Sequence, residues 1–152
     1  MAAITLNGTE LRTSDGRLTT WIRKGLYGPP DYRGDTWVIA GKAGETVVAG
    51  SFVRARRMIE LGQQIKGIGA TEALAQVDFL ATVDALKTLY ESTMGAPKDL
   101  RVYAPLYGIG GSYRHLNVQW VNTIESDPIG GFQQIVTVRF ACYDDPPEWV
   151  AV

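Results

Sequence analysis

The residues that could do chemistry are few and scattered along this chain. His115 is the only histidine and Cys142 the only cysteine, so a histidine-cluster metal site and an internal disulfide are both excluded. A Ser–His–Asp arrangement around His115 is formally possible, but no Gly-x-Ser-x-Gly motif presents the serine. Alternation along the C-terminal strands places Cys142 on the apolar side and His115 on the polar side, which argues against a Cys–His pair. The chain is therefore predicted not to be an enzyme.

Two further patterns resemble binding motifs without matching them. Asp127, Asp144, Asp145 and Glu148 could hold a cation only if loops brought them together, and their spacing is not that of an EF-hand. Turn chemistry at strand ends explains these carboxylates equally well. The glycine-rich run 108–112 lacks the lysine and the following helix of a phosphate loop. No metal and no cofactor are expected.

Composition describes an ordinary globular protein with room for one core. The chain has 152 residues, 45% hydrophobic and 20% charged, with a formal net charge of -1. A protein that binds nucleic acid through its bulk charge would be more basic. The N-terminus lacks the pattern of a signal peptide, and no apolar run approaches the ~20 residues of a membrane span. Folding in a reducing cytoplasm without a membrane anchor is the expectation.

Hydrophobic periodicity predicts several strands and one long helix. A capping residue, Thr71, precedes a segment in which Phe79, Val83, Leu86 and Tyr90 fall at helical spacing, so a helix over 72–93 should pack on a sheet. Leu74, Val77 and Leu89 are further apolar residues near this stripe. The strand-like and apolar segments lie at 4–7, 18–26, 36–40, 52–65, 100–106, 112–124 and 132–142. This order predicts a single α+β domain with a β-rich body.

The last two strands each have an apolar and a polar side. Leu116, Val118, Trp120 and Ile124 should face the core from one strand, and Val136, Val138, Phe140 and Cys142 from the other. The polar side is made mainly of amides and hydroxyls: His115, Asn117, Gln119, Thr123, Gln133, Thr137 and Arg139. Two interpretations remain open, an ordinary solvated face and the wall of a channel built by several copies.

Other residues are candidates for contacts between copies of the chain. Arg57 lies on the apolar side of its strand, where it either extends to an edge or pairs with a neighbouring subunit. Aromatic residues near loops and ends commonly anchor interfaces. The interface candidates are Arg54, Arg56, Arg57, Tyr27, Trp37 and Trp149.

Two short motifs then carry a family resemblance. The strand Arg57-Met58-Ile59-Glu60-Leu61-Gly62 precedes the single helix, and Phe140-Ala141-Cys142-Tyr143-Asp144-Asp145-Pro146 closes the last strand. In order and pattern the chain resembles the N-terminal domain of siphophage distal tail proteins and, more broadly, the tail-tube fold. The resemblance implies antiparallel sheets, sandwich-like or barrel-like, with one long helix on the side, in one domain over 1–152 with an extended tail over 144–152.

The resemblance also implies a structural role in the virion. Copies would form a homo-oligomeric ring, hexameric in that family, at the distal tip of the phage tail. The ring would join the tail tube to the baseplate hub, and its lumen would pass the tape measure protein and then the genome without specific binding. A chain of this length leaves no room for the carbohydrate-binding-like domain that many family members carry, so a host-receptor role is not expected.

Three other functions stay open at this level. A major tail-tube subunit shares the fold and differs in copy number per virion. A carbohydrate-binding β-sandwich module would use Trp37, Trp149 and the tyrosines. An enzyme with an unrecognised site is the least expected. Ring symmetry, the face that lines a lumen, the neighbouring proteins and the host cannot be read from the sequence.

Overall fold

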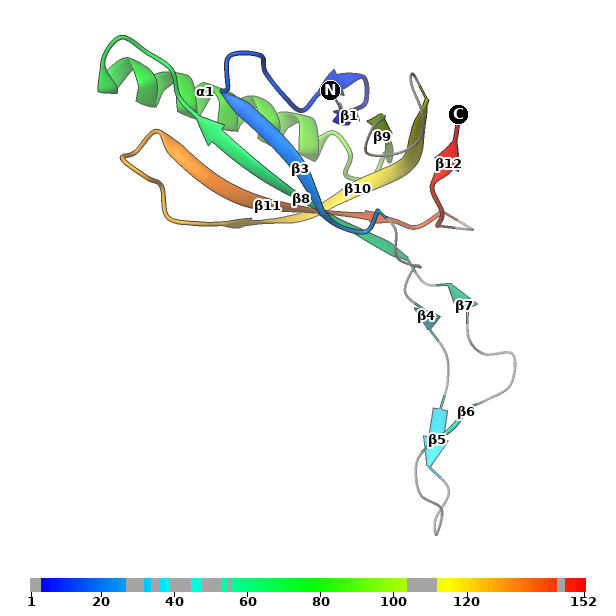
Figure 1. Cartoon of the computed structure of the whole chain (residues 1–152). Helices are drawn as coiled ribbons and strands as arrows, with labels where there is room; N and C mark the ends of the chain where they lie inside the picture. The colour runs from blue at the N-terminus through cyan, green and yellow to red at the C-terminus, as the bar shows by residue number, and fades with distance from the viewer. Residues whose placement is uncertain are drawn as a thin grey trace.

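The computed structural model describes residues 4–26, 32–33, 36–38, 45–47, 53–54, 56–103, 112–144 and 147–152. Within these ranges the chain forms twelve strands and one helix (Figure 1). The elements are β1 (Ile4–Leu6), β2 (Thr9–Glu10), β3 (Leu18–Lys24), β4 (Tyr32–Arg33), β5 (Thr36–Val38), β6 (Glu45–Val47), β7 (Val53–Arg54), β8 (Arg57–Lys66), α1 (Glu72–Glu91), β9 (Lys98–Tyr103), β10 (Tyr113–Glu125), β11 (Gln133–Cys142) and β12 (Val150–Ala151).

One antiparallel sheet forms the body of the molecule. Its strands follow the order β2-β1-β9-β10-β11-β8-β3, and β12 pairs with β10 as an eighth strand. The helix α1 lies along one side of this sheet (Figure 1). The predicted α+β class, with antiparallel strands and a single long helix, is confirmed for the described residues. The sheet is open rather than closed into a sandwich or barrel, because β2 and β3 end the strand order without pairing to each other.

Alternation along the three longest strands produces the core, as predicted. In β8 and β11 all ten residues of each strand pair with the other, from Gln133 opposite Lys66 to Cys142 opposite Arg57. Every second side chain in this ladder is buried against α1 or the neighbouring strands. The fully buried residues at the centre are Ile59, Leu61, Val118, Val138 and Phe140. The sheet face beneath α1 is therefore the hydrophobic core.

The predicted helix is confirmed, and its predicted stripe faces the sheet. Thr71 caps the first turn, where its hydroxyl accepts a 3.3 Å hydrogen bond from the Leu74 backbone N–H. Phe79 and Tyr90 are buried on the sheet, whereas Leu74 is 55% exposed and Val77 is 65% exposed. These two residues are near the stripe in sequence, but they lie on the opposite side of the helix from the sheet-facing positions.

The predicted strand 52–65 is two strands in two separate ladders. β8 belongs to the main sheet, while β7 pairs with β4. The two short ladders β4–β7 and β5–β6 lie away from the sheet in Figure 1. The division falls where the ladder partner ends, because the pairing of β11 with β8 stops at Cys142 opposite Arg57. Beyond that point the chain has no neighbouring β11 residue to extend the ladder.

A β-bulge reverses the predicted faces at the end of β10. The register with β11 shifts between Trp120 and Asn122, so Thr123 pairs with buried Val138 and Ile124 pairs with Thr137. Thr123 consequently lies on the helix side, while Ile124 is 46% exposed on the other side. The predicted faces of Thr123 and Ile124 are wrong, because one extra residue in a strand inverts the alternation that follows it.

Candidate functional site: the open face of the sheet

The side of β3, β8, β11 and β10 turned away from α1 is the candidate functional surface, called here the open face. Six of the seven side chains predicted on the polar side lie on it. They are His115, Asn117 and Gln119 on β10 and Gln133, Thr137 and Arg139 on β11, all at positions that alternate with buried residues. Thr123 is excluded from this group by the bulge.

An ion pair at the centre of the open face is flanked by two bulges. The Arg139 Nε donates to Glu60 Oε1 at 3.1 Å across the β8–β11 ladder. The register of β3 with β8 shifts between Ile22 and Lys24, which places Lys24 opposite Glu60. The bulge in β10 places Asn122 opposite Arg139. Each bulge adds one residue to its strand. β3 and β10 therefore each have an extra residue beside the Glu60–Arg139 pair.

A tryptophan lies on the same face against a glycine. Trp21 and Gly62 pair across β3 and β8, and a Cβ on Gly62 would stand only 2.3 Å from the Trp21 ring. Glycine is therefore required there for the indole to lie flat on the sheet. The guanidinium carbon of Arg23 lies 5.7 Å from the centre of the Trp21 ring. The sequence analysis does not predict this contact of Trp21 with Gly62, although a glycine inside an alternating strand indicates that another group approaches the backbone closely.

The single histidine belongs to a polar cluster on β9 and β10. His115 Nδ1 lies 3.2 Å from Asp99 Oδ1, and Arg101 Nε donates to Asp99 Oδ2 at 2.5 Å. The Arg101 guanidinium carbon lies 4.8 Å from the centre of the Tyr113 ring. The hydrogen bond from Arg101 to Asp99 raises the pKa of the guanidinium further above its usual range. Asp99 thus accepts a hydrogen bond from Arg101 and lies beside His115 within the sheet face.

The buried cysteine has no sign of activation. Cys142 is fully buried, and burial raises the pKa of its thiol to about 11. It contributes to the core beside Phe140, as the strand pattern predicted. Among the described residues, no group of three or more histidine, cysteine, aspartate or glutamate side chains is placed to hold a metal ion. No helix in the described ranges is long and apolar enough to cross a membrane.

Two of the predicted interface residues make contacts within the chain. Arg57 is buried, and its guanidinium donates to the carbonyls of Pro147 at 2.9 Å and Gly25 at 3.2 Å. Trp149 Nε1 donates to the same Gly25 carbonyl at 3.0 Å. Gly25 has a φ of 96°, and a Cβ there would stand 2.3 Å from the Met58 carbonyl oxygen.

These bonds hold the C-terminal segment on the body of the protein. Residues 150–151 form β12, in which Val150 pairs with His115 and Ala151 with Arg114. The chain after 144 was predicted to be a tail that leaves the sheet, whereas this part of it returns to β10. Of the remaining interface candidates, Arg56 is exposed. The side chains of Tyr27, Trp37 and Arg54 lie outside the described residues.

Hollows lie beside the helix in the described part of the chain. A cavity of about 270 Å³ lies between α1 and the sheet, with Tyr90, Trp120, Thr123 and Gln134 in its lining. A wider groove of about 760 Å³ lies between α1 and the segment 9–18. The Arg17–Asp78 ion pair, with Nε and Oδ2 at 2.8 Å, stands at the groove.

Comparison with known proteins gives a likeness of fold. No protein-family model matches the chain, and no curated protein matches it in sequence. Its structure is similar to the crystal structure of the SPP1 Dit (gp 19.1) protein, a paradigm of the hub adsorption apparatus in phages that infect Gram-positive hosts. The TM-score is 0.65 at 17% identity, over 95% of this chain and 50% of that chain.

A second likeness is to a chain of the phage p2 baseplate in its activated conformation with Sr. The TM-score is 0.50 at 9% identity, over 91% of this chain and 42% of that chain. The present chain therefore spans half the length of the first structure and less of the second. The fold expected from the resemblance to distal tail proteins is confirmed, and at these identities the likeness concerns the fold alone.

Proposed function

We propose that this protein is a structural component of a siphophage tail tip, a distal tail protein whose copies form a ring. The observation that carries the proposal is the fold likeness to SPP1 Dit over 95% of this chain at a TM-score of 0.65. The short motifs in β8 and at the end of β11 independently resemble the same family. The likeness to a chain of the phage p2 baseplate supports the same location.

The mechanism of such a protein is assembly. The strand order of the open sheet ends in β2 and β3, which are unpaired on their outer sides among the described residues, and β12 pairs with β10 alone. Unpaired strand edges readily accept a strand or loop from a neighbouring copy. If the rotation between copies closes, a head-to-tail contact of this kind produces a ring. The ring is expected to be hexameric, with the tail tube on one side and the baseplate hub on the other.

The open face is the proposed wall of the ring's lumen. α1 covers the other side of the sheet, which leaves the open face as the exposed surface of the sheet itself (Figure 1). The tape measure protein and then the genome would pass along it. In this proposal the protein acts in the virion, after assembly in the host cytoplasm, and performs no catalysis.

The test is the oligomeric state of the full chain. Purified protein, measured by native mass spectrometry and by negative-stain electron microscopy, should form closed rings of one symmetry. Arg56→Glu should reduce the ring fraction, because Arg56 is an exposed interface candidate. Lys87→Glu, an equal charge change at an exposed position of α1, is the matched control. A strictly monomeric protein at high concentration that is also absent from purified particles contradicts the proposal.

A further inference from the structure

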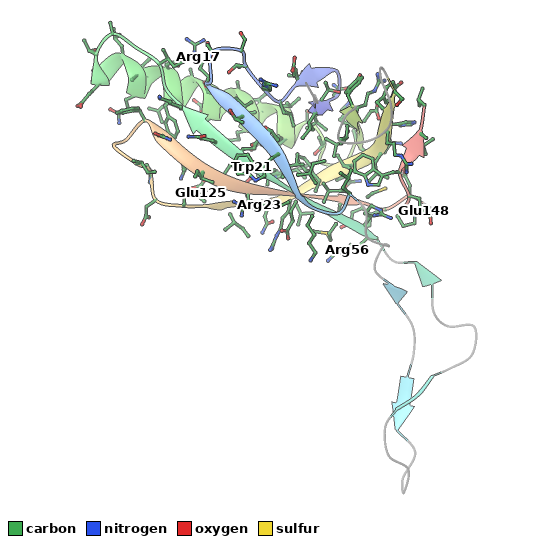
Figure 2. All side chains as sticks on the ribbon, viewed as in Figure 1. Arg17, Trp21, Arg23, Arg56, Glu125 and Glu148 are labelled. Atoms are coloured by element: carbon green, nitrogen blue, oxygen red, sulfur yellow. The ribbon has the colours of Figure 1, made fainter. Side chains whose placement is uncertain are left out.

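The two sides of the sheet differ in charge, although the whole chain is nearly neutral. On β3, β8, β11 and β10, the described open face carries four cations, Arg23, Lys24, Lys66 and Arg139, and one carboxylate, Glu60. These five residues are called here the basic face. Figure 2 shows Arg23 and Arg56 on the side of the sheet opposite α1, and Arg56 adds a further exposed cation beside β8.

The helix itself has the opposite sign. Along α1, four carboxylates stand against the single lysine, Lys87; they are Glu72, Asp78, Asp84 and Glu91. Arg17 pairs with Asp78, which leaves the other three as the acidic groups of the helix without this partner. A formal net charge of -1 for the chain thus conceals a basic sheet face and an acidic helix. Charges sorted in this way produce a directed field that a mixed surface would not have.

The cations of the basic face are spread out rather than gathered around one point. Lys66 and Lys24 lie near opposite ends of the β8–β3 ladder, which pairs Ile65 with Leu18 at one end and Glu60 with Lys24 at the other. Lys66 stands six residues along β8 from Glu60, the partner of Lys24, which at ~3.3 Å per residue is roughly 20 Å. A single carboxylate or phosphate ligand needs donors that converge, so this arrangement instead fits an extended polyanion.

Duplex DNA has the matching charge density. It carries one phosphate charge per ~1.7 Å of axis, so ~20 Å of duplex presents on the order of ten charges. The Glu60–Arg139 pair lowers the charge at the centre of the face without removing it. We propose that the basic face binds the phosphate backbone of DNA, weakly, without sequence preference and with strong dependence on salt.

A second copy of this chain is a less complementary occupant. The acidic helix of a neighbour would bring its exposed Leu74, Val77 and Leu80 against the cations. Such a pairing would desolvate charges opposite apolar surface, which is unfavourable.

The experiment is a fluorescence anisotropy titration of the full chain onto labelled duplex DNA of about 30 base pairs and mixed sequence. Binding should weaken linearly on a log–log plot between about 20 mM and about 200 mM NaCl, with a slope near ~-0.9 per phosphate contacted. The triple variant R23Q/K24Q/K66Q should bind roughly tenfold more weakly at the lowest salt and show a slope reduced by about two to three.

The matched pair K66Q and K87Q separates a local effect from a change in total charge. Both lysines are exposed, so neither substitution should unfold the chain. K66Q should weaken DNA binding and K87Q should leave it unchanged. Equal effects of the two variants overturn the proposal, as does a triple variant that binds DNA like the unaltered chain.

Two other polyanions test whether the basic face prefers DNA. Poly-glutamate and vesicles containing phosphatidylserine, at the same concentration of negative charge, should bind more weakly than DNA. If either binds as tightly, the face is not a DNA surface. This inference goes beyond the proposed ring: micrographs can show rings from a protein that binds no DNA, and DNA binding can be measured on a protein that forms none.

Discussion

The buried hydrogen bonds of Gln63 lead to a quantitative prediction about stability. Gln63 is fully buried, and its carboxamide connects the helix to two strands. Its oxygen accepts from the Tyr90 hydroxyl at 2.6 Å, and its nitrogen donates to the Thr20 hydroxyl at 3.1 Å. Tyr90→Phe removes one hydroxyl, leaves the apolar ring in place, and leaves the Gln63 oxygen without its donor.

The expected loss of unfolding free energy is about 1–3 kcal/mol, because a buried acceptor then remains unsatisfied. The cavity beside Tyr90 and Gln63 favours the lower half of that range, since a water that enters it could serve as donor. For a domain of this size each kcal/mol corresponds to about 2–4 °C in Tm. The ring contact of Tyr90 with Phe140, at a centroid distance of 5.4 Å, should survive the substitution.

Urea unfolding of four proteins measures the effect: the unaltered chain, Y90F, Q63M and the double variant. Methionine replaces the carboxamide with an apolar group of similar size. The double variant therefore lacks both the Tyr90 hydroxyl and the Gln63 oxygen, and neither group is left without the other. The sum of the single losses should exceed the loss in the double variant by about 1–2 kcal/mol. Tyr143→Phe, at an exposed tyrosine, is the control and should change little.

The pH dependence provides an independent signature. Burial raises the pKa of the Tyr90 phenol, so the neutral form is favoured in the folded state. Above the ordinary tyrosine pKa of about 10, only the unfolded chain ionises at this position, and stability falls as pH rises. Y90F should lose less stability between neutral pH and that range. Additive losses in the urea experiment, or an alkaline profile unchanged by Y90F, would refute the reasoning.

Three other substitutions test separate parts of the structure. The Cβ of alanine at position 62 would stand 2.3 Å from the Trp21 indole, so Gly62→Ala should displace the ring and destabilise the fold by about 1–3 kcal/mol. Tryptophan fluorescence should shift, and an unshifted spectrum would show that the ring does not lie against Gly62. Arg57→Leu should release the Pro147 carbonyl and make the C-terminal segment cleavable in limited proteolysis, and unchanged cleavage would show that this bond is not required. The hydrogen bond from the Ile68 N–H, and then Arg17, hold the pKa of the Asp78 carboxyl below its usual range. The stability that this carboxylate contributes is therefore present above an ordinary aspartate pKa and is lost as pH falls. Asp78→Asn should lower Tm at neutral pH and flatten the acid side of the plot of Tm against pH, whereas parallel plots for the two proteins would contradict this.

Much of the secondary structure is readable from the sequence, because each signal is local. Strict alternation predicts β10 and β11 nearly to the residue, and the Thr71 cap with its apolar spacing predicts α1. The burial of Val136, Val138 and Phe140 follows directly from that alternation. The α+β class and the absence of a recognisable catalytic motif rest on the same kind of evidence.

The faces near bulges could not be predicted, because a bulge is defined by its partner strand. Thr123 and Ile124 exchange sides once β10 gains a residue relative to β11. Arg57 similarly has no local signal for its role. Its acceptors are carbonyls that the fold brings from Gly25 and Pro147, far away in the sequence.

The sequence by itself determined the elements, the polar and apolar sides of most strands and the near-neutral charge of the whole chain. Only the tertiary structure decided how that charge is distributed. Arg23 and Lys24 are far from Lys66 in the sequence, but the pairing of β3 with β8 places all three on one face of the sheet. The carboxylates of α1 lie on the other side. Net charge is a sum over residues, whereas the field that a partner meets depends on their positions in space.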